Sequence, residues 1–267
     1  MREASVGHQC PECVAEGRRT QRQARTAFGG SLAGGAGYAT RALIGINVIF
    51  LVISVIGGGA GAIAGGGGLG GLLGSSTPLL RWGGVLGYAI YGGEVHGVAA
   101  GEWYRLITAM FLHYGVIHLL LNMILLWQLG RYLEARLGPL RFLAVYLLAG
   151  LGGNVAAYAF SPRNGITAGA STAVFGLILA VFVVNRKLRL DTSSLIPLIV
   201  VNLIFTFTVS GVSIPGHVGG LLVGGIVAAI MAYAPRDRRN LIQWIGCAVV
   251  LALLIVVAVV RTQALLN

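Results

Sequence analysis

Residues 168–185 read AGASTAVFGLILAVFVVN, an apolar stretch long enough to cross a bilayer that contains one serine, Ser171. A second such stretch, residues 215–234, reads PGHVGGLLVGGIVAAIMAYA and contains one histidine, His217. Ionisable side chains are costly in hydrocarbon, so those found there usually serve a function. A serine and a histidine supply a nucleophile and a base. The two stretches therefore predict both a membrane fold and a hydrolytic site within it.

The composition agrees with a membrane protein. Of the 267 residues, 56% are hydrophobic and 10% are charged, and the mean hydropathy is +0.83. Soluble domains have about 25% charged residues. The net charge of +11 comes from short basic clusters between apolar runs, which is typical of membrane topology rather than of nucleic-acid binding. We therefore expect the lipid bilayer, and no nucleic acid, as a partner.

Seven apolar runs have a length compatible with membrane spans. They cover residues 42–60, 111–130, 142–160, 168–185, 195–211, 215–234 and 241–260. The run at 195–211 is the shortest and contains Pro197. The predicted fold class is an all-α polytopic membrane protein.

The basic residues divide unevenly between the two ends of these spans. With the N-terminus inside, 15 of the 19 Lys and Arg residues fall on the inner side. The four outer ones are Arg81, Arg105, Arg163 and Arg261. Inner connections of membrane proteins are enriched in Lys and Arg. We therefore expect a multi-pass plasma membrane protein with a cytoplasmic N-terminus and an outer C-terminus.

Residues 1–40 form a polar arm, which we expect to be separate from a membrane domain over residues 41–267. The arm contains Cys10 and Cys13, with His8 just before them. Two cysteines at this spacing make half of a structural zinc site, which normally has four ligands. Two interpretations stay open. The arm has a free dithiol, or His8, Cys10 and Cys13 bind zinc together with a ligand from another chain or from residues upstream.

A long outer loop follows the first span. Residues 57–74 are mostly glycine, and the loop continues to about residue 110. A loop of this length usually has structure of its own. Trp82, Trp103 and Tyr104 predict that it lies at the membrane interface.

Ser171 and His217 are expected to meet. A serine is nearly inert until a base takes its proton, and histidine is the usual base. Both residues lie within three positions of the outer start of their predicted spans, so they lie at similar depth on the same side of the membrane. Gly220 and Gly224 follow His217 at the small-x-x-x-small spacing that lets two helices approach closely.

A second polar cluster opens the run at 111–130. His118 and Asn122 are four residues apart and so share one helix face. Both can donate hydrogen bonds to the oxyanion that forms during acyl transfer, beside the backbone N–H of Ser171. His113 is five residues before His118 and is expected to point elsewhere, toward the long loop.

Other catalytic chemistries fit less well. No Asp or Glu lies within the predicted spans, so an aspartyl protease is excluded and a metalloprotease lacks its usual general base. No metal or organic cofactor is expected in the membrane domain.

Taken together, the motifs resemble the rhomboid family of intramembrane serine proteases, in its bacterial seven-span form. The resemblance rests on Glu102-Trp103-Tyr104-Arg105, His113-x4-His118-x3-Asn122, Gly169-x-Ser171-x3-Phe175-Gly176 and Gly216-His217-x-Gly219-Gly220. It covers about residues 80–235. It implies a six-helix rhomboid-like bundle with one extra C-terminal helix, the run at 241–260. The arm also resembles the end of a zinc-finger-like extension.

The resemblance implies a role for each matching residue. Ser171 becomes the nucleophile and His217 the general base, in a dyad without a carboxylate. His118 and Asn122 become oxyanion donors, His113 a supporting residue, and Gly169 a position that lets the substrate approach. Trp103 and Arg105 would anchor the outer loop, although Tyr104 separates them here. The implied partners are single-span or polytopic membrane proteins, cleaved near the outer membrane boundary.

Two other functions stay open. A non-catalytic relative could bind membrane helices without cleaving them, although such proteins typically lack the serine or the histidine. A channel or transporter could use the polar residues as a pathway, although internal repeats typical of secondary transporters are not visible.

Overall fold

In the computed structural model, residues 2–3, 8–20, 24–59, 61–64, 76–193, 195–209 and 211–267 are described. Six helical segments among them are long and apolar enough to cross a membrane. They are α2 (Tyr38–Gly58), the continuous segment Val116–Leu137, α8 (Pro139–Phe160), α9 (Ser171–Leu188), α11 (Ile214–Tyr233) and α12 (Arg239–Leu266). The segment Val116–Leu137 comprises α6 (Val116–Leu125), a π-helical turn (Leu126–Gly130) and α7 (Arg131–Leu137). A shorter apolar helix, α10, covers Leu195–Thr208.

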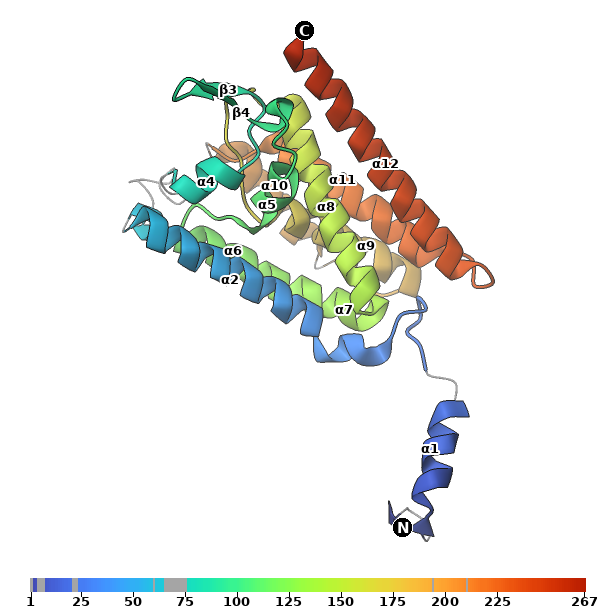
Figure 1. The fold of residues 1–267 in the computed structure, drawn as a ribbon. Helices are drawn as coiled ribbons and strands as arrows, with labels where there is room; N and C mark the ends of the chain where they lie inside the picture. The colour runs from blue at the N-terminus through green and yellow to red at the C-terminus, as the bar shows by residue number, and fades with distance from the viewer. Residues whose placement is uncertain are drawn as a thin grey trace.

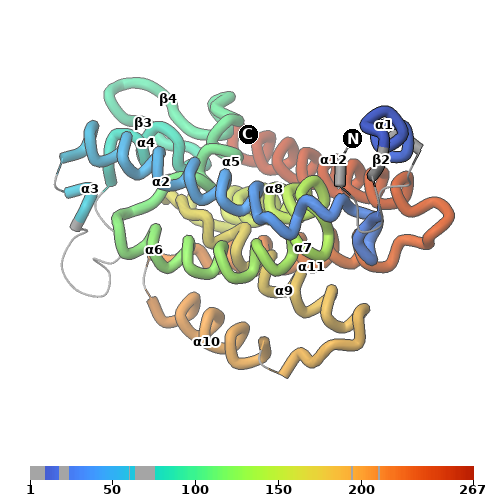
Figure 2. The backbone as a smooth tube through the Cα atoms, turned by 90° about the horizontal axis from the view of Figure 1, so that it is seen from below, coloured from blue at the N-terminus to red at the C-terminus, as the bar shows by residue number. Residues whose placement is uncertain are grey.

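The helices form one bundle (Figure 1). The central helices α8 and α9 are the most buried of the six, and α11 packs against both. Helix α12 lies along the outside of α8 and α11, while α10 lies at the periphery beside α9 (Figure 2). The predicted all-α polytopic fold with an added C-terminal helix is confirmed.

Helix α10 is shorter than its neighbours. Its 14 residues correspond to about 21 Å at 1.5 Å per residue, against a hydrocarbon core of about 30 Å. The predicted run at 195–211 therefore forms an apolar helix that does not reach full spanning length in an upright orientation.

The outer loop has structure of its own, as predicted. It contains α3 (Gly61–Ala64), α4 (Pro78–Gly83), strands β3 (Ala89–Tyr91) and β4 (Glu94–His96), a 3-10 turn (Val98–Ala100), α5 (Arg105–Thr108) and a second 3-10 turn (Ala109–Phe111). The strands form an antiparallel hairpin in which Ile90 pairs with Val95. Within the predicted glycine-rich stretch 57–74, residue 60 and residues 65–74 lie outside the described residues.

The side chain of Arg105 links separate segments of this loop by hydrogen bonds. Its side chain is only 1% exposed, and its Nε donates to the Glu102 carboxylate at 2.6 Å. A second guanidinium nitrogen donates to the backbone oxygens of Arg81 at 2.7 Å and Gly84 at 3.0 Å. These bonds join the start of α5 to α4 and to Gly84, the residue that follows α4. Trp103 is partly exposed and is free to lie at the interface.

Glu134 corrects one sequence-based expectation. The expectation that no carboxylate lies within the spans is wrong, because the helix continues past residue 130 and Glu134 is fully buried in α7. Its carboxylate accepts hydrogen bonds from the N–H groups of Ala39 and Thr40 and from the Thr40 hydroxyl, at 2.7–2.9 Å. The first-turn N–H groups of α2 therefore compensate for burying the charge.

The polar arm is partly packed against the bundle. It contains the strand pair β1 (Arg2–Glu3) and β2 (His8–Gln9), helix α1 (Pro11–Thr20) and a 3-10 turn (Leu32–Ala36). Phe28 is buried in the core. A Cβ atom on Gly30 would lie 1.9 Å from the Leu137 carbonyl oxygen, so the later half of the arm lies directly on the end of α7.

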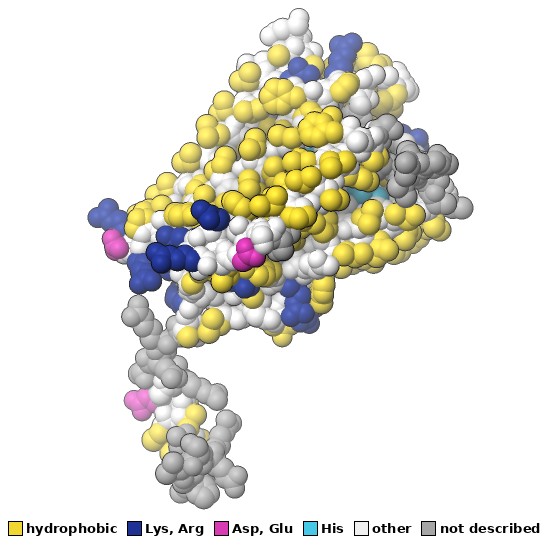
Figure 3. Space-filling view, turned by 180° about the vertical axis from the view of Figure 1, so that it is seen from behind, with side chains coloured by type: hydrophobic (Ala, Val, Ile, Leu, Met, Phe, Trp, Pro, Cys, Tyr) yellow, Lys and Arg dark blue, Asp and Glu magenta, His cyan; other side chains and the backbone are white. Residues whose placement is uncertain are grey.

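The surface has the pattern expected of a protein in lipid. Large apolar side chains are exposed along the outer helices, among them Leu253 and Val260 of α12. Figure 3 shows hydrophobic side chains over much of the visible face, with many Lys and Arg side chains near the end from which the arm emerges. Such a surface is stable where hydrocarbon, rather than water, surrounds it.

Candidate active site

Ser171 begins helix α9. The chain reaches it through Gly169, whose φ of +142° is unfavourable for other residues. The first intrahelical bond runs from the Val174 N–H to the Ala170 carbonyl. The N–H groups of the first turn, including that of Ser171, thus precede the hydrogen-bonded ladder. They also lie at the positive end of the helix dipole, which favours a developing negative charge.

His217 lies in the first turn of α11. Ser213 caps this helix by accepting from the Gly216 N–H at 3.1 Å, and Pro215 occupies its first turn, both of which favour a helix start. The Nε2 atom of His217 lies 2.8 Å from Oγ of Ser171. The imidazole stacks on the ring of Phe175 with centroids 4.1 Å apart, and its Nδ1 lies 2.7 Å from the Thr206 hydroxyl of α10.

Glycines bring α9 and α11 close enough for this contact. A Cβ atom on Gly220 would lie 2.0 Å from the Thr172 carbonyl oxygen. On α8, a Cβ atom on Gly153 would lie 2.5 Å from the Gly216 carbonyl oxygen. The close approach predicted for the glycines after His217 is therefore present in the structure.

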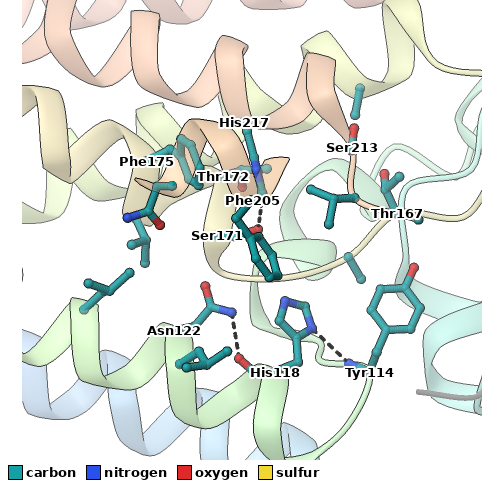
Figure 4. A pocket seen from close by; sticks show the side chains of 18 of the residues that line it. Tyr114, His118, Asn122, Thr167, Ser171, Thr172, Phe175, Phe205, Ser213 and His217 are labelled. Atoms are coloured by element: carbon teal, nitrogen blue, oxygen red, sulfur yellow. Dashed lines mark hydrogen bonds between the residues drawn. The ribbon is translucent and has the colours of Figure 1, made fainter. Parts of the chain in front are cut away.

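His118 and Asn122 face the same cavity as Ser171 (Figure 4). Asn122 donates from Nδ2 to the His118 carbonyl at 2.8 Å. Nδ1 of His118 accepts from the Tyr114 N–H at 3.3 Å, so the proton of the neutral ring is on Nε2. A Cβ atom on Gly169 would lie 3.0 Å from that Nε2 and 3.3 Å from Ser171 Oγ. Gly169 thus makes room for the His118 ring beside the serine.

His113 is not part of the helix. Helix α6 begins at Val116, after Gly115 with φ +143°, so the helical angle used to orient His113 does not apply. Its Nε2 accepts from the Ala170 N–H at 3.4 Å, and its ring packs edge-on against His118 with centroids 5.1 Å apart. The expectation that His113 faces the long loop is wrong, because it contacts the segment just before Ser171.

The cavity has a volume of about 320 Å³ and lies between α6, α9, α10 and α11. Its apolar walls include Leu121, Val174 and Phe205. No acidic side chain is among the described residues that line it. The groups available for chemistry there are one hydroxyl–imidazole pair and several hydrogen-bond donors, an arrangement suited to acyl transfer.

The candidate zinc ligands lie in the polar arm. Cys10 and Cys13 are exposed free thiols, at the start of α1. Within the described ranges, no three His, Cys, Asp or Glu side chains are grouped closely enough to hold a metal ion. The zinc cluster of His8, Cys10 and Cys13 stays a prediction. Cys247 is buried.

The sequence analysis assigned no role to two residues of the site. Phe175 was part of a motif without a role, and Thr206 was not singled out. A signal for Thr206 existed, because Asn202 and Thr206 are polar residues four apart in a mostly apolar helix and so share one face.

Comparison with known proteins decides the family. Residues 100–235, slightly more than half of the chain, match the Rhomboid domain model. The chain belongs to the rhomboid family. Together with the six apolar helices, this makes it a multi-pass membrane protein. The matched region contains Ser171, His217, His118 and Asn122.

Several rhomboid relatives are similar in sequence. The chain is 43% identical over 144 residues to rhomboid protease GluP of Bacillus subtilis (strain 168), a match that covers 52% of this chain and 28% of GluP. It is 35% identical over 148 residues to YdcA of the same organism, covering 54% of this chain and 74% of YdcA. It is 35% identical over 173 residues to RHOMBOID-like protein 5 of Arabidopsis thaliana, a match that covers 62% of this chain and 53% of that relative.

Proposed function

We propose that this protein is an intramembrane serine endopeptidase that cleaves transmembrane helical substrates near the outer membrane boundary. The observation that carries the proposal is the 2.8 Å contact between His217 Nε2 and Ser171 Oγ, in a cavity that also contains His118 and Asn122. Membership of the rhomboid family supports it, since relatives such as GluP are named as rhomboid proteases.

The proposed reaction begins with acylation. Oγ of Ser171 attacks the scissile carbonyl carbon while His217 Nε2 takes the hydroxyl proton. The carbonyl oxygen becomes an oxyanion, which accepts hydrogen bonds from the Ser171 N–H, from Nε2–H of His118 and from the second amide hydrogen of Asn122. His217 then donates its proton to the amine as the C–N bond breaks, leaving an acyl-serine.

Deacylation uses the same groups in reverse. A water molecule attacks the acyl carbon while His217 takes one of its protons, and the same donors stabilise the second oxyanion. Collapse returns the proton to Ser171 Oγ and releases the carboxylic acid. No acidic side chain is among the described cavity-lining residues. His217 is assigned as the base because its Nε2 lies within hydrogen-bond distance of Ser171 Oγ.

The location of the pair supports cleavage near one membrane boundary. Ser171 is the first residue of α9 and His217 is the fourth residue of α11. Both therefore lie about one turn or less from the helix ends. From the basic asymmetry of the sequence, we propose that those ends face the outer side and that the N-terminus lies in the cytoplasm. We propose the plasma membrane as the location.

Cleavage in a reconstituted bilayer tests the proposal. Purified protein in liposomes is mixed with a single-span substrate, and products are identified by mass spectrometry. We expect a cut within or next to the substrate's transmembrane segment, lost in Ser171→Ala. Intact substrate in the wild-type reaction, with the substrate shown to be incorporated, would favour a non-catalytic helix-binding protein.

A further inference from the structure

Thr206 is the buried polar residue of α10 that contacts the proposed base. It is 1% exposed, and its Oγ1 lies 2.7 Å from Nδ1 of His217. The same Oγ1 lies 2.8 Å from the carbonyl oxygen of Asn202 on its own helix. A threonine buried among apolar side chains could satisfy its hydroxyl with the helix carbonyl alone. The contact with His217 is an addition that the helix does not need.

The two contacts of Thr206 fix where its proton lies. A carbonyl oxygen can only accept a hydrogen bond, so the 2.8 Å contact with Asn202 requires the hydroxyl hydrogen to lie between the two oxygens. A hydroxyl has one hydrogen and two lone pairs. The lone pairs therefore face His217, and the hydrogen in the 2.7 Å contact must come from Nδ1.

A proton on Nδ1 has a consequence at the other side of the ring. A neutral imidazole has one N–H, so Nε2 then presents a lone pair. That lone pair faces Ser171 Oγ at 2.8 Å, in the orientation needed to accept the serine proton. The opposite tautomer would place an N–H against the serine and leave no acceptor there.

We propose that Thr206 is a positioning residue, which holds His217 in the tautomer and ring orientation that let Nε2 accept the Ser171 proton. This inference rests on the proposed serine peptidase function and deepens it. Phe175 stacks on the ring face and restrains its plane, while Thr206 restrains rotation within that plane. The role that a carboxylate has in triad enzymes is taken here by a neutral hydroxyl on α10.

The hydrogen bond also stabilises the reacting state. When His217 takes the serine proton it becomes an imidazolium, and Nδ1–H remains donated to Thr206. This bond is already present with the neutral ring, and it becomes stronger when the ring is charged. Only that increase affects the chemical step, so we expect its loss to lower kcat on the order of 10-fold. Substrate binding does not involve this bond, so KM should change little.

Three variants on one helix test the role. Thr206→Val removes the hydroxyl at nearly constant volume, whereas Thr206→Ser keeps the hydroxyl and removes only the methyl group. Thr208→Val is the matched control, because the Thr208 hydroxyl makes the same bond to its own helix, to the Ile204 carbonyl at 2.7 Å, and is exposed. We expect the kcat loss in Thr206→Val, recovery in Thr206→Ser and no change in Thr208→Val. Thermal stability is measured in parallel.

Nitrogen NMR of histidine-labelled protein gives a readout independent of activity. His217 is assigned by comparison with His217→Gln. We expect Nδ1 to be protonated in the wild type and a mixture of tautomers in Thr206→Val. Protonation of Nε2 in the wild type would overturn the inference, whether or not the protein folds with valine at 206.

The outcomes separate this inference from the function on which it rests. Wild-type kcat in Thr206→Val, while Ser171→Ala is inactive, would overturn the role of Thr206 and leave the serine mechanism intact. Wild-type turnover that persists in Ser171→Ala would overturn the mechanism itself, and the tautomer spectra would still decide what Thr206 does to the ring.

Discussion

Gly224 of α11 lies against Gly176 of α9 so closely that a Cβ atom on Gly224 would sit 2.3 Å from the Cα atom of Gly176. This contact is about two turns along α11 from His217. It sets the separation of the two helices that supply the serine and the histidine. The hydrogen bond between Ser171 and His217 therefore depends on a backbone contact away from the site.

Gly224→Ala should force α9 and α11 apart. Overpacking a tight contact costs about 1–3 kcal/mol, and we expect a lower melting temperature together with reduced turnover. Gly45→Ala is the control, since nothing lies within 4 Å of its added Cβ and alanine is favoured in helices by about 1 kcal/mol. Melting curves and turnover are measured for both. Full activity in Gly224→Ala would contradict the dependence of the site on this contact.

Asn122→Ala tests transition-state stabilisation. Losing one oxyanion donor lowers kcat by about 10²–10³ in serine proteases, so we expect a loss of this order with KM nearly unchanged. Asn202→Ala is the matched control. The side chains of Asn122 and Asn202 both line the cavity, and each donates a 2.8 Å hydrogen bond to the carbonyl four residues before it. A large drop in melting temperature with normal kcat would instead assign Asn122 to helix packing.

Acid should loosen the outer loop through Glu102. Partial burial opposes its charge, but hydrogen bonds from Arg105, the Gly97 N–H and His96 lower the pKa of Glu102 below its ordinary value. The stabilisation by this carboxylate is therefore fully present above its unfolded pKa, about 4.3, and is lost as the pH falls through the lower folded pKa. We expect the melting temperature to drop in that window.

Glu102→Gln should lower the melting temperature at neutral pH and flatten the drop in acid. The neutral-pH effect arises because Arg105 keeps its buried charge without a carboxylate partner. Glu94→Gln is the control, since the Glu94 side chain is 82% exposed. An acid drop in Glu102→Gln as steep as in the wild type would assign the acid sensitivity to other groups.

Reporter fusions test the proposed orientation. A reporter after Asn267 should read outside, and one inserted within residues 186–191 should read inside, because the basic residues concentrate on the inner side. A cytoplasmic reading for both sites would mean that α10 or α12 does not cross the membrane.

The long helices and the meeting of two of them were predictable from the sequence. Apolar length placed α8, α9 and α11 within a few residues, and their small residues indicated a close approach. Ser171 and His217 were recognisable because each is a reactive group in an apolar stretch. These features are local, so they can be read from composition and spacing.

The remaining differences arise from contacts between distant segments. Glu134 looks like a loop residue because it is charged. In the structure it is buried in α7, where two N–H groups of α2, 94 and 95 residues away in the chain, donate hydrogen bonds to its carboxylate. Helical spacing misplaced His113 because Gly115 starts the helix after it. Thr206 meets His217 only through the packing of α10 on α11, which periodicity within either helix does not reveal.

The most direct test of the central claim is to locate the adduct of a serine-directed phosphonate by mass spectrometry of the labelled protein. The account predicts a single adduct on Ser171, no adduct in Ser171→Ala and strongly slowed labelling in His217→Ala. Because the pair acts as a unit, the double variant should be as unreactive as Ser171→Ala alone. Stoichiometric labelling of another residue, or labelling that persists unchanged in His217→Ala, would contradict the proposed Ser171–His217 mechanism.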